Sequence, residues 1–334
     1  MIKLREASTA LAGTNWVQSN KTNGVLTTLC ITSTGRIIAG VAGNGIWYSD
    51  DNGVNWIQSS KTSGQCESLG ITSTGRIIAG FSGGVWYSDN NGVNWTKLGT
   101  SSTYSHVLCI TPTGRIITSM SVIISGNVVD MGFSYSDDNG VNWVQSNKTN
   151  GSWWCLCIIP TGRIIAGSNG YGIWYSDDNG VNWTQSSKTS GECESLCITS
   201  TGRIIAGFYG GIWYSDDNGI NWARSNKTDD IFRSLCVTAT GRIIAGGDSS
   251  KGIWYSDDNG VNWTRSNKID ESWYVLCITS TGRIIAGSNG SGIWYSDPEV
   301  ITAKNAREKY LDQNGAQEIV TQFKAYCDSL VGGA

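Results

Sequence analysis

The chain has 334 residues, of which 15% are charged, and a formal net charge of −3. A chain of this length can bury a substantial core. The weakly negative charge gives no overall attraction to nucleic acid, and no apolar stretch is long enough to span a membrane, so we expect neither nucleic acid nor a membrane as a partner.

The sequence opens with a predicted strand at 13–18, and a unit of roughly 40 residues then recurs to residue 297. Seven Thr-Gly-Arg turns mark the period, with arginines at Arg36, Arg76, Arg115, Arg163, Arg203, Arg242 and Arg283. Within each copy a nearly constant stretch alternates with a stretch that differs every time. The constant stretch builds the scaffold, and the varied stretch is free to make contacts.

Each unit is predicted to form four short β-strands. In the fourth copy these strands are 156–159, 164–166, 173–176 and 182–184, separated by turns rich in Gly, Asn and Asp. Short β-branched and aromatic runs of this kind are typical of an antiparallel meander, and four strands in about 40 residues match one propeller blade. No copy has an apolar pattern of helical period, which excludes helical solenoids.

The two ends of the array predict a closed ring. The strand at 13–18 corresponds to a fourth strand without its first three, and the last copy, 276–297, lacks a fourth strand. Together the two fragments complete one blade. We therefore predict an all-β fold over residues 1–298: a seven-bladed β-propeller of four-stranded antiparallel blades, closed by the N-terminal strand.

The turn before each fourth strand follows one motif. Its first copy, Ser49-Asp50-Asp51-Asn52-Gly53-Val54-Asn55-Trp56, recurs at 136–143, 176–183, 215–222 and 256–263. The motif resembles the Asp box, Ser-x-Asp-x-Gly-x-x-Trp, of the bacterial neuraminidase repeat family of propellers. Blade 2 departs from it with Asn90, and Pro298 interrupts the last copy. The resemblance covers residues 11–297 and implies a fold rather than an activity, because one fold hosts many activities.

The Asp-Asp-Asn-Gly turn has two interpretations, a Ca²⁺ site or a structural turn. Its oxygen positions do not follow the order of an EF-hand loop and no Glu ends it, so we favour the structural turn, and we expect no metal and no cofactor. The seven turn arginines are expected to pair with the neighbouring box aspartates rather than to form an anion-binding ring.

Ten cysteines are present, and six hold one equivalent position in the first strand: Cys30, Cys109, Cys157, Cys197, Cys236 and Cys277. Such repetition indicates small buried apolar residues, which are too far apart to form disulfides. No zinc-site spacing occurs, and His106 is the only histidine. Free thiols without a signal peptide predict synthesis in a reducing cytoplasm, which is compatible with later release in a virus particle.

Two segments vary between copies. One surrounds the start of the first strand, and the other joins strands two and three, where the third copy is lengthened to 120–131. Because strand direction alternates, both segments are expected on one face of the ring, opposite the arginine turns and Asp boxes. We call these the variable face and the constant face.

The varied segments keep large aromatic rings, Phe208 among them, and exposed aromatic residues on loops usually mark recognition. We predict a ligand site on the variable face at Trp153, Trp154, Tyr171, Tyr209, Phe232, Arg233, Trp273, Tyr274, Glu67, Glu194 and His106. A glycan fits this mixture, because sugars stack on Trp and Tyr while acids and Arg bind the hydroxyls. A protein partner fits it too, since Tyr, Trp and Arg are common anchors. We favour a lectin-like function, with a protein-interaction scaffold as the alternative.

The family resemblance also raises an enzyme hypothesis. The family's sialidases use an arginine triad, a Tyr–Glu pair and an Asp, but only Arg233 is placed on the variable face and the Arg-Ile-Pro signature is missing. We therefore do not expect a sialidase. The acids Glu67, Glu194, Glu271 and Asp270 remain candidates for another glycosidase.

Residues 299–334 lose the repeat and are predicted to hold a short helix. Within 316–330, one helical stripe carries Ile319, Phe323, Tyr326, Cys327 and Leu330. Such a helix folds back on the ring, associates with other copies or docks on a larger assembly. Residues 310–315 and this helix resemble short segments of bacteriophage tail-associated proteins, which implies a phage or prophage adhesion component.

Overall fold

The computed structural model describes residues 16–98, 104–124, 127–248, 251–266 and 271–296. Every regular element within these ranges is a β-strand, as predicted. The expected C-terminal helix and the boundary at residue 298 lie outside the described residues.

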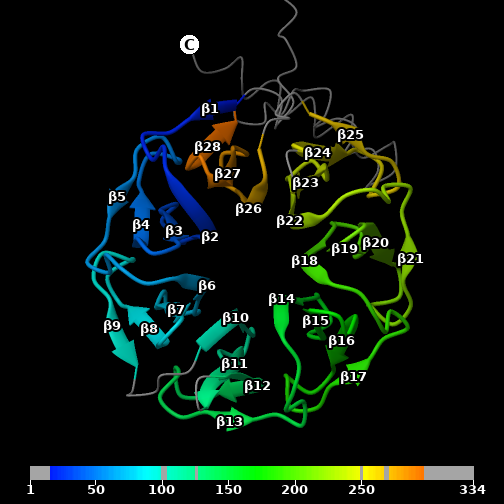
Figure 1. Ribbon diagram of the computed structural model, residues 1–334, viewed down its shortest axis with the longest axis horizontal. Coiled ribbons are helices and arrows are strands. Elements are labelled where there is room, and N and C mark those ends of the chain that lie inside the picture. The colour runs from blue at the N-terminus through cyan, green and yellow to red at the C-terminus, as the bar shows by residue number, and fades with distance from the viewer. Residues whose placement is uncertain (1–15, 99–103, 125–126, 249–250, 267–270, 297–334) are drawn as a thin grey trace, which may run out of the picture.

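The strands form blades around a central axis (Figure 1). Blade 1 contains β2 (Gly24–Ile31), β3 (Ile37–Val41), β4 (Gly45–Ser49) and β5 (Ile57–Gln58). Blade 2 contains β6 (Cys66–Ile71), β7 (Ile77–Phe81), β8 (Gly84–Ser88) and β9 (Thr96–Leu98). Blade 3 contains β10 (Tyr104–Ile110), β11 (Ile116–Ile124), β12 (Asn127–Ser136) and β13 (Val144–Gln145).

The same pattern continues around the ring. Blade 4 contains β14 (Trp153–Ile158), β15 (Ile164–Ser168), β16 (Ile173–Ser176) and β17 (Thr184–Gln185). Blade 5 contains β18 (Cys193–Ile198), β19 (Ile204–Phe208), β20 (Gly211–Ser215) and β21 (Ala223–Arg224). Blade 6 contains β22 (Phe232–Val237), β23 (Ile243–Gly247), β24 (Ile253–Ser256) and β25 (Thr264–Arg265).

Both ends of the repeat array contribute to blade 7. Strands β26 (Trp273–Ile278), β27 (Ile284–Gly290) and β28 (Ile293–Ser296) are completed by β1 (Trp16–Gln18), which pairs antiparallel with β28. A second ladder joins the ends, because Gly24 and Val25 of β2 pair with Gly290 and Asn289 of β27. The predicted closure by the N-terminal strand is therefore confirmed.

The core lies between blades rather than within one blade. The second strand of each blade is sandwiched between its neighbours, so Ile164, Ile165 and Ala166 are fully buried. The glycine that follows allows close approach: a Cβ on Gly40 would lie 2.9 Å from the Cβ of Cys66 in the next blade. Each core cluster consequently joins two adjacent blades, as blades 4 and 5 are joined around Ile165 and Ile204.

The constant face carries the Asp boxes, and the box is a turn held by its own side chains. The Ser49 hydroxyl accepts a hydrogen bond from the Gly53 N–H at 2.9 Å, and the Asp51 carboxylate accepts one from the Asn55 N–H at 2.8 Å. Gly53 has a φ of 84° and Asn52 a φ of 58°. The positive φ at Asn52 was not predicted, and Asn tolerates it better than most residues.

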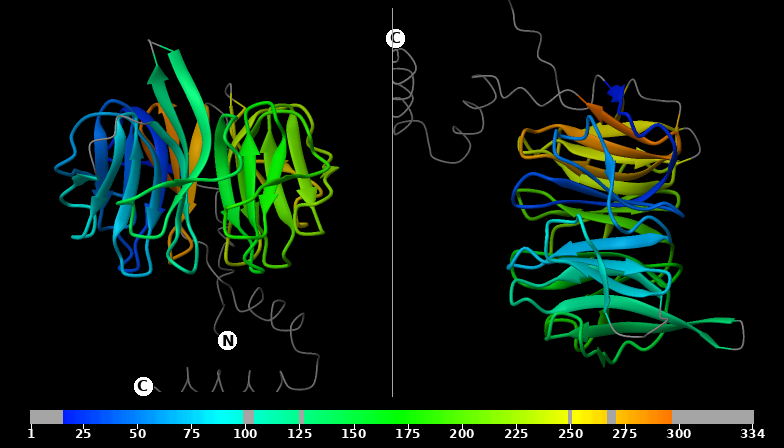
Figure 2. Two further views of the ribbon diagram at one scale, coloured as in Figure 1. Left: turned by 90° about the horizontal axis from the view of Figure 1, so that it is seen from below. Right: turned by 90° about the vertical axis from the view of Figure 1, so that its left-hand side faces the viewer.

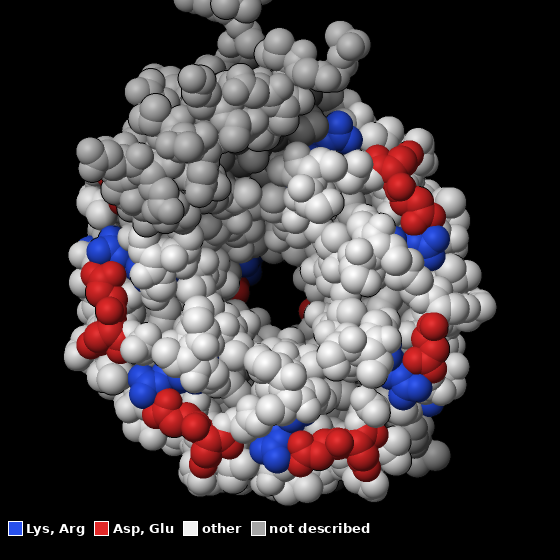
Figure 3. All heavy atoms as spheres, turned by 180° about the vertical axis from the view of Figure 1, so that it is seen from behind, with Lys and Arg blue, Asp and Glu red and all other residues white. Residues whose placement is uncertain are grey.

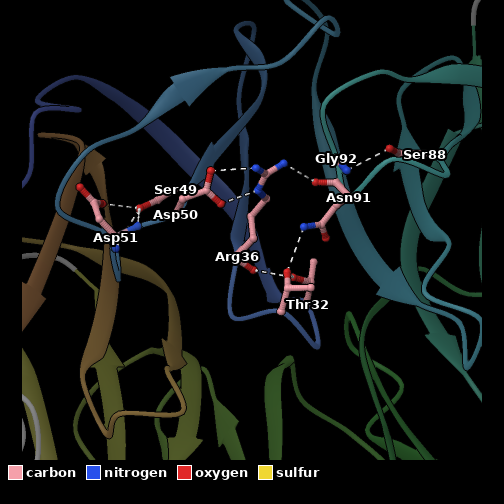
Figure 4. A network of polar contacts seen from close by, with 10 residues as sticks. Thr32, Arg36, Ser49, Asp50, Asp51, Ser88, Asn91 and Gly92 are labelled. Carbon is pink, nitrogen blue, oxygen red and sulfur yellow. Dashed lines mark hydrogen bonds and ion pairs between the residues drawn. The ribbon is translucent and has the colours of Figure 1, made fainter.

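The turn arginines pair with box aspartates, as predicted, and also join neighbouring blades (Figure 4). Arg36 donates to both carboxylate oxygens of Asp50, at 2.6 and 2.7 Å, and to the Asn91 carbonyl of blade 2 at 3.0 Å. The Asn91 side-chain amide donates back to the Thr34 hydroxyl of blade 1 at 3.0 Å. Four further arginines reach the equivalent carbonyl of the next blade: Arg115, Arg163, Arg203 and Arg283. Figure 3 shows the resulting alternation of basic and acidic groups around the rim.

Candidate functional site

The two faces separate as the strand directions predict. The lengthened hairpin of β11 and β12 projects from the variable face and extends beyond the other blades (Figure 2). The hairpin carries the exposed apolar residues Ile124 and Val128. Space-filling atoms surround an open channel through the ring, with a few charged groups in its wall (Figure 3).

One of the two varied positions proves to be part of the core. Every first strand shares one leucine, which is Leu29 in blade 1 and Leu156 in blade 4. The residue three places before this conserved leucine is fully buried in all seven blades, at Leu26, Cys66, Ser105, Trp153, Cys193, Phe232 and Trp273. Phe208 is 2% exposed. The prediction that Trp153, Phe232 and Trp273 contact a ligand is therefore wrong.

Size compensation explains why this buried position varies. Each of these residues lies opposite a residue of the second strand; in six blades a larger residue faces a smaller one, and in blade 1 two residues of middle size face each other. The pairs are Leu26 with Val41, Cys66 with Phe81, Ser105 with Met120, Trp153 with Ser168, Cys193 with Phe208, Phe232 with Gly247 and Trp273 with Ser288. Close-packed interiors require this complementarity, so the variation reflects packing.

The neighbouring varied position has a different role. In every blade the ladder between the first and second strands shifts register at the residue two places before the leucine; in blade 3 the shift spans His106 and Val107. A β-bulge of this kind re-aims a side chain and frequently occurs next to active sites. The bulged residues, which we call the bulge ring, are Thr27, Glu67, His106, Trp154, Glu194, Arg233 and Tyr274.

All seven members of the bulge ring are partly exposed, and they belong to the innermost strands, which line the channel (Figure 1). Neighbouring members also contact one another or the next strand. Arg233 reaches Glu194 of blade 5, its guanidinium lies 4.9 Å from the ring centre of Tyr274 in blade 7, and Thr27 donates to the carbonyl of Cys66. The structure therefore brings Glu194, Arg233 and Tyr274 into contact and places Glu67, His106, Trp154 and Thr27 at the same bulge position of the other blades.

Arg233 is held between two acids. Its Nη1 lies 3.3 Å from both Glu194 carboxylate oxygens, and its Nε donates to Asp248 at 2.7 Å. Burial raises the pKa of Glu194 to about 6, and the Arg233 charge opposes that rise. Burial also raises the pKa of Glu67. Asp248 was not predicted as a site residue. It lies in the turn after the second strand of blade 6, and the bulge brings Arg233 to it.

His106 takes part in a hydrogen bond that resembles a base–nucleophile pair. Its Nε2 lies 2.8 Å from the Ser121 hydroxyl, and Asp130 lies opposite Ser121 on the neighbouring strand. Burial lowers the pKa of His106. Ser121 has no exposed surface, however, so a substrate has no access to its hydroxyl. The arrangement stabilises the base of the long hairpin.

Two predicted residues lie beside the bulge ring on the turns between strands two and three. Tyr171 of blade 4 is 55% exposed and Tyr209 of blade 5 is 65% exposed. Their exposure agrees with the prediction. They belong to the same two blades as Trp154 and Glu194.

The sequence reasoning missed a set of lysines on this face. Each lies in the loop between blades and places its ammonium group over the strand-three tryptophan. Lys61 is 4.7 Å from the Trp86 ring centre, Lys188 is 4.6 Å from Trp213, and Lys227 is 3.9 Å from Trp254. The Lys-Thr pair that follows five of the seven fourth strands was the available signal. These contacts fix the loops that lead into the bulge ring.

Among the described residues, no group of three His, Cys, Asp or Glu side chains is arranged to hold a metal ion. That part of the chain also lacks a helix with the length and apolar character needed to cross a bilayer.

Comparisons with known proteins agree with this architecture. A family profile described as BNR/Asp-box repeat matches residues 213–224 and 254–265, and no curated protein matches the sequence. Among solved structures, YCF48 from Cyanidioschyzon merolae has a TM-score of 0.67 at 14% identity, covering 85% of this chain and 99% of that chain. A structure of YCF48 bound to D1 peptide has a TM-score of 0.65 at 15% identity, covering 86% and 99%.

Enzymes share the fold as well. The Niastella koreensis GH74 enzyme has a TM-score of 0.63 at 16% identity, covering 85% of this chain and 44% of that chain. Virginiamycin B lyase from Staphylococcus aureus has a TM-score of 0.65 at 9% identity, covering 84% and 98%. At these identities the similarity establishes the propeller fold and leaves enzymatic activity open.

Proposed function

Because the chain is a propeller that carries BNR/Asp-box repeats, we propose that it is a binding protein whose ligand docks on the bulge ring and the adjoining tyrosines. One observation carries this proposal. The same bulge occurs in all seven blades at a position whose side chains share no size or charge, and all of them are partly exposed. Packing explains the variation at the neighbouring buried position but not at this one.

The ligand we favour is a glycan. Trp154 and Tyr274 offer aromatic surfaces for the C–H faces of sugar rings, and Glu194 and Arg233 lie between them in blade order. Carboxylate and guanidinium groups bind hydroxyls through charge-assisted hydrogen bonds. A role as an adhesion component of a phage or prophage would suit such a ligand, and the resemblance of residues 310–315 to tail-associated segments motivates it.

A protein partner is the second candidate. The exposed rings of Tyr171 and Tyr209 favour it, since tyrosine is a frequent anchor at protein interfaces. The fold also supports a peptide ligand elsewhere, because one structurally similar protein, YCF48, was solved with D1 peptide bound.

A glycan array tests these candidates. We expect wild-type protein to bind a defined set of glycans, Trp154→Ala to lose that binding, and Ile57→Ala, which alters an exposed outer strand, to keep it. If the wild-type protein binds none of the glycans on a broad array, the glycan hypothesis is rejected and the protein partner is favoured. Turnover of a chromogenic glycoside that disappears in Glu194→Gln would instead support an enzyme.

A further inference from the structure

Two cysteines face each other across the boundary between blades 4 and 5. The Sγ atoms of Cys155 and Cys193 are 3.7 Å apart, and the Cys155 Sγ lies 3.5 Å from the Cys193 carbonyl oxygen. Cys193 is fully buried and Cys155 is 8% exposed. A disulfide requires the two sulfur atoms to approach to about 2.05 Å, and the thiols are already within van der Waals contact of each other.

The two sulfur atoms can occupy this position because Gly167 has no side chain. A Cβ on Gly167 would lie 2.4 Å from the Cys155 Sγ and 2.5 Å from the Cys193 Sγ. Both sulfur atoms therefore occupy the same small gap in the second strand of blade 4. Other heavy atoms do not separate them at this distance.

This arrangement is specific to one boundary of the ring. At each boundary, the residue just before the conserved leucine faces the buried varied residue of the next blade. The seven facing pairs, all within the described residues, are Thr28 with Cys66, Ser68 with Ser105, Val107 with Trp153, Cys155 with Cys193, Ser195 with Phe232, Ser234 with Trp273 and Val275 with Leu26. Only one pair consists of two thiols.

We propose that Cys155 and Cys193 are a modification site, at which a peroxide oxidises the two thiols to a reversible disulfide that joins blades 4 and 5. One thiolate attacks a peroxide oxygen and becomes a sulfenic acid, and the hydroxide that leaves takes up the proton of that thiol to form water. The second thiolate attacks the sulfenic sulfur and displaces a second hydroxide, which takes up the proton of the second thiol. Two thiols and one hydrogen peroxide give one disulfide and two waters, so hydrogen peroxide is the only co-reactant.

The position of the bond gives it a consequence for the candidate site. Cys155 directly follows Trp154, and Cys193 directly precedes Glu194. A disulfide here therefore fixes the spacing of two neighbouring members of the bulge ring. The modification itself does not depend on the proposed function, because the bond forms with or without a ligand.

Burial raises the pKa of the Cys155 thiol, which makes oxidation slow near neutral pH and faster in mildly alkaline buffer. Reduced full-length protein is treated with hydrogen peroxide under native conditions, unfolded in denaturant with an alkylating agent, and digested with trypsin. We expect peptides 149–163 and 189–203 to be joined with the loss of two hydrogen atoms. Peptide 62–76, which contains Cys66, is the internal control. We expect to find it unlinked and alkylated, because Cys66 faces Thr28 and has no thiol opposite it.

The two joined peptides also contain Cys157 and Cys197, so the bond must be located. Fragmentation of the joined peptides assigns it in the wild-type protein, and the double variant Cys157→Ser/Cys197→Ser must still form it. Cys193→Ser must abolish it. The oxidised protein should melt roughly 5 °C above the reduced protein, and a reducing agent should reverse this shift.

Two results would overturn the proposal. One is the absence of the joined peptides after prolonged oxidation at mildly alkaline pH while circular dichroism shows a folded protein. The other is a bond located between Cys157 and Cys197.

Discussion

Trp153 lies directly opposite Ser168 on the neighbouring strand, whereas the equivalent pair in blade 5 is Cys193 opposite Phe208. The large residue is thus on the first strand in blade 4 and on the second strand in blade 5. In both blades the pair fills the same space in the core. A repeat protein can vary a buried position in this way, provided that its partner compensates. Sequence variation between repeats is therefore not by itself evidence of a binding surface.

This compensation predicts non-additive mutations in blade 4. Trp153→Leu should destabilise the protein by about 3 kcal/mol through a cavity. Ser168→Val should cost about 1 kcal/mol by overpacking. The double variant recreates the Leu26–Val41 pair of blade 1 and should be more stable than the sum of the single effects by at least about 1 kcal/mol. Denaturant unfolding of the four proteins measures this coupling, and strict additivity would contradict the packing explanation.

The arginines of the constant face should differ in their contribution. Arg36 bonds Asp50 and the Asn91 carbonyl of blade 2, whereas the hydrogen bonds of Arg76 among the described residues go to Asp89 alone. Because both partner aspartates are exposed, the ion pairs themselves contribute little. Arg36→Met should therefore cost about 1 kcal/mol more than Arg76→Met, through the lost contact between blades. Equal losses in unfolding free energy would show that this contact is unimportant.

Asp230 should make stability depend on pH. It precedes β22, is buried, and has one carboxylate oxygen without a hydrogen-bond partner among the described residues. Burial raises its pKa from 3.8 to about 6. A raised pKa means that folding favours the protonated form of Asp230. The contribution of this protonation to the free energy of unfolding is therefore fully present below about pH 4 and is lost as the pH rises through about 6.

The variant Asp230→Asn cannot ionise and should lack this loss. Other groups also titrate, so the informative quantity is the difference in unfolding free energy between variant and wild type. That difference should shift in favour of the variant by on the order of 2 kcal/mol between about pH 4 and neutral pH. A difference that stays constant across this range would show that Asp230 titrates normally.

The closing strand should stabilise the whole ring. Deletion of residues 1–20 removes β1 and its pairing with Trp294, Tyr295 and Ser296. It also exposes Trp273, whose ring centre lies 6.0 Å from that of Trp16. We expect a fall of several kcal/mol in unfolding free energy, whereas deletion of residues 1–12 leaves β1 in place and serves as the control. Equal stability of the two truncated proteins would show that the β2–β27 ladder suffices for closure.

The fold could be read from the sequence because its signals are local and repeated. Each Asp box specifies a turn through its own Ser, Asp and Gly, and five full copies at regular spacing imply the ring. The site was only partly predictable. Trp153 and Trp154 are adjacent and chemically identical, yet one is buried and the other partly exposed. Their difference arises from the bulge at Trp154 and from the small side chain of Ser168 opposite Trp153, and neither is visible without the register of the neighbouring strand.

Hydroxyl-radical footprinting tests the location of the site most directly. Full-length protein is oxidised with and without the glycan that binds most strongly on the array, and the modified residues are identified by mass spectrometry. We predict that binding reduces oxidation of Trp154 and Tyr274 and leaves the partly exposed constant-face residues Tyr48 and Trp222 unchanged. Protection of the constant-face residues, or unchanged oxidation of Trp154 and Tyr274 at saturating ligand, would contradict the assignment of the bulge ring as the binding site.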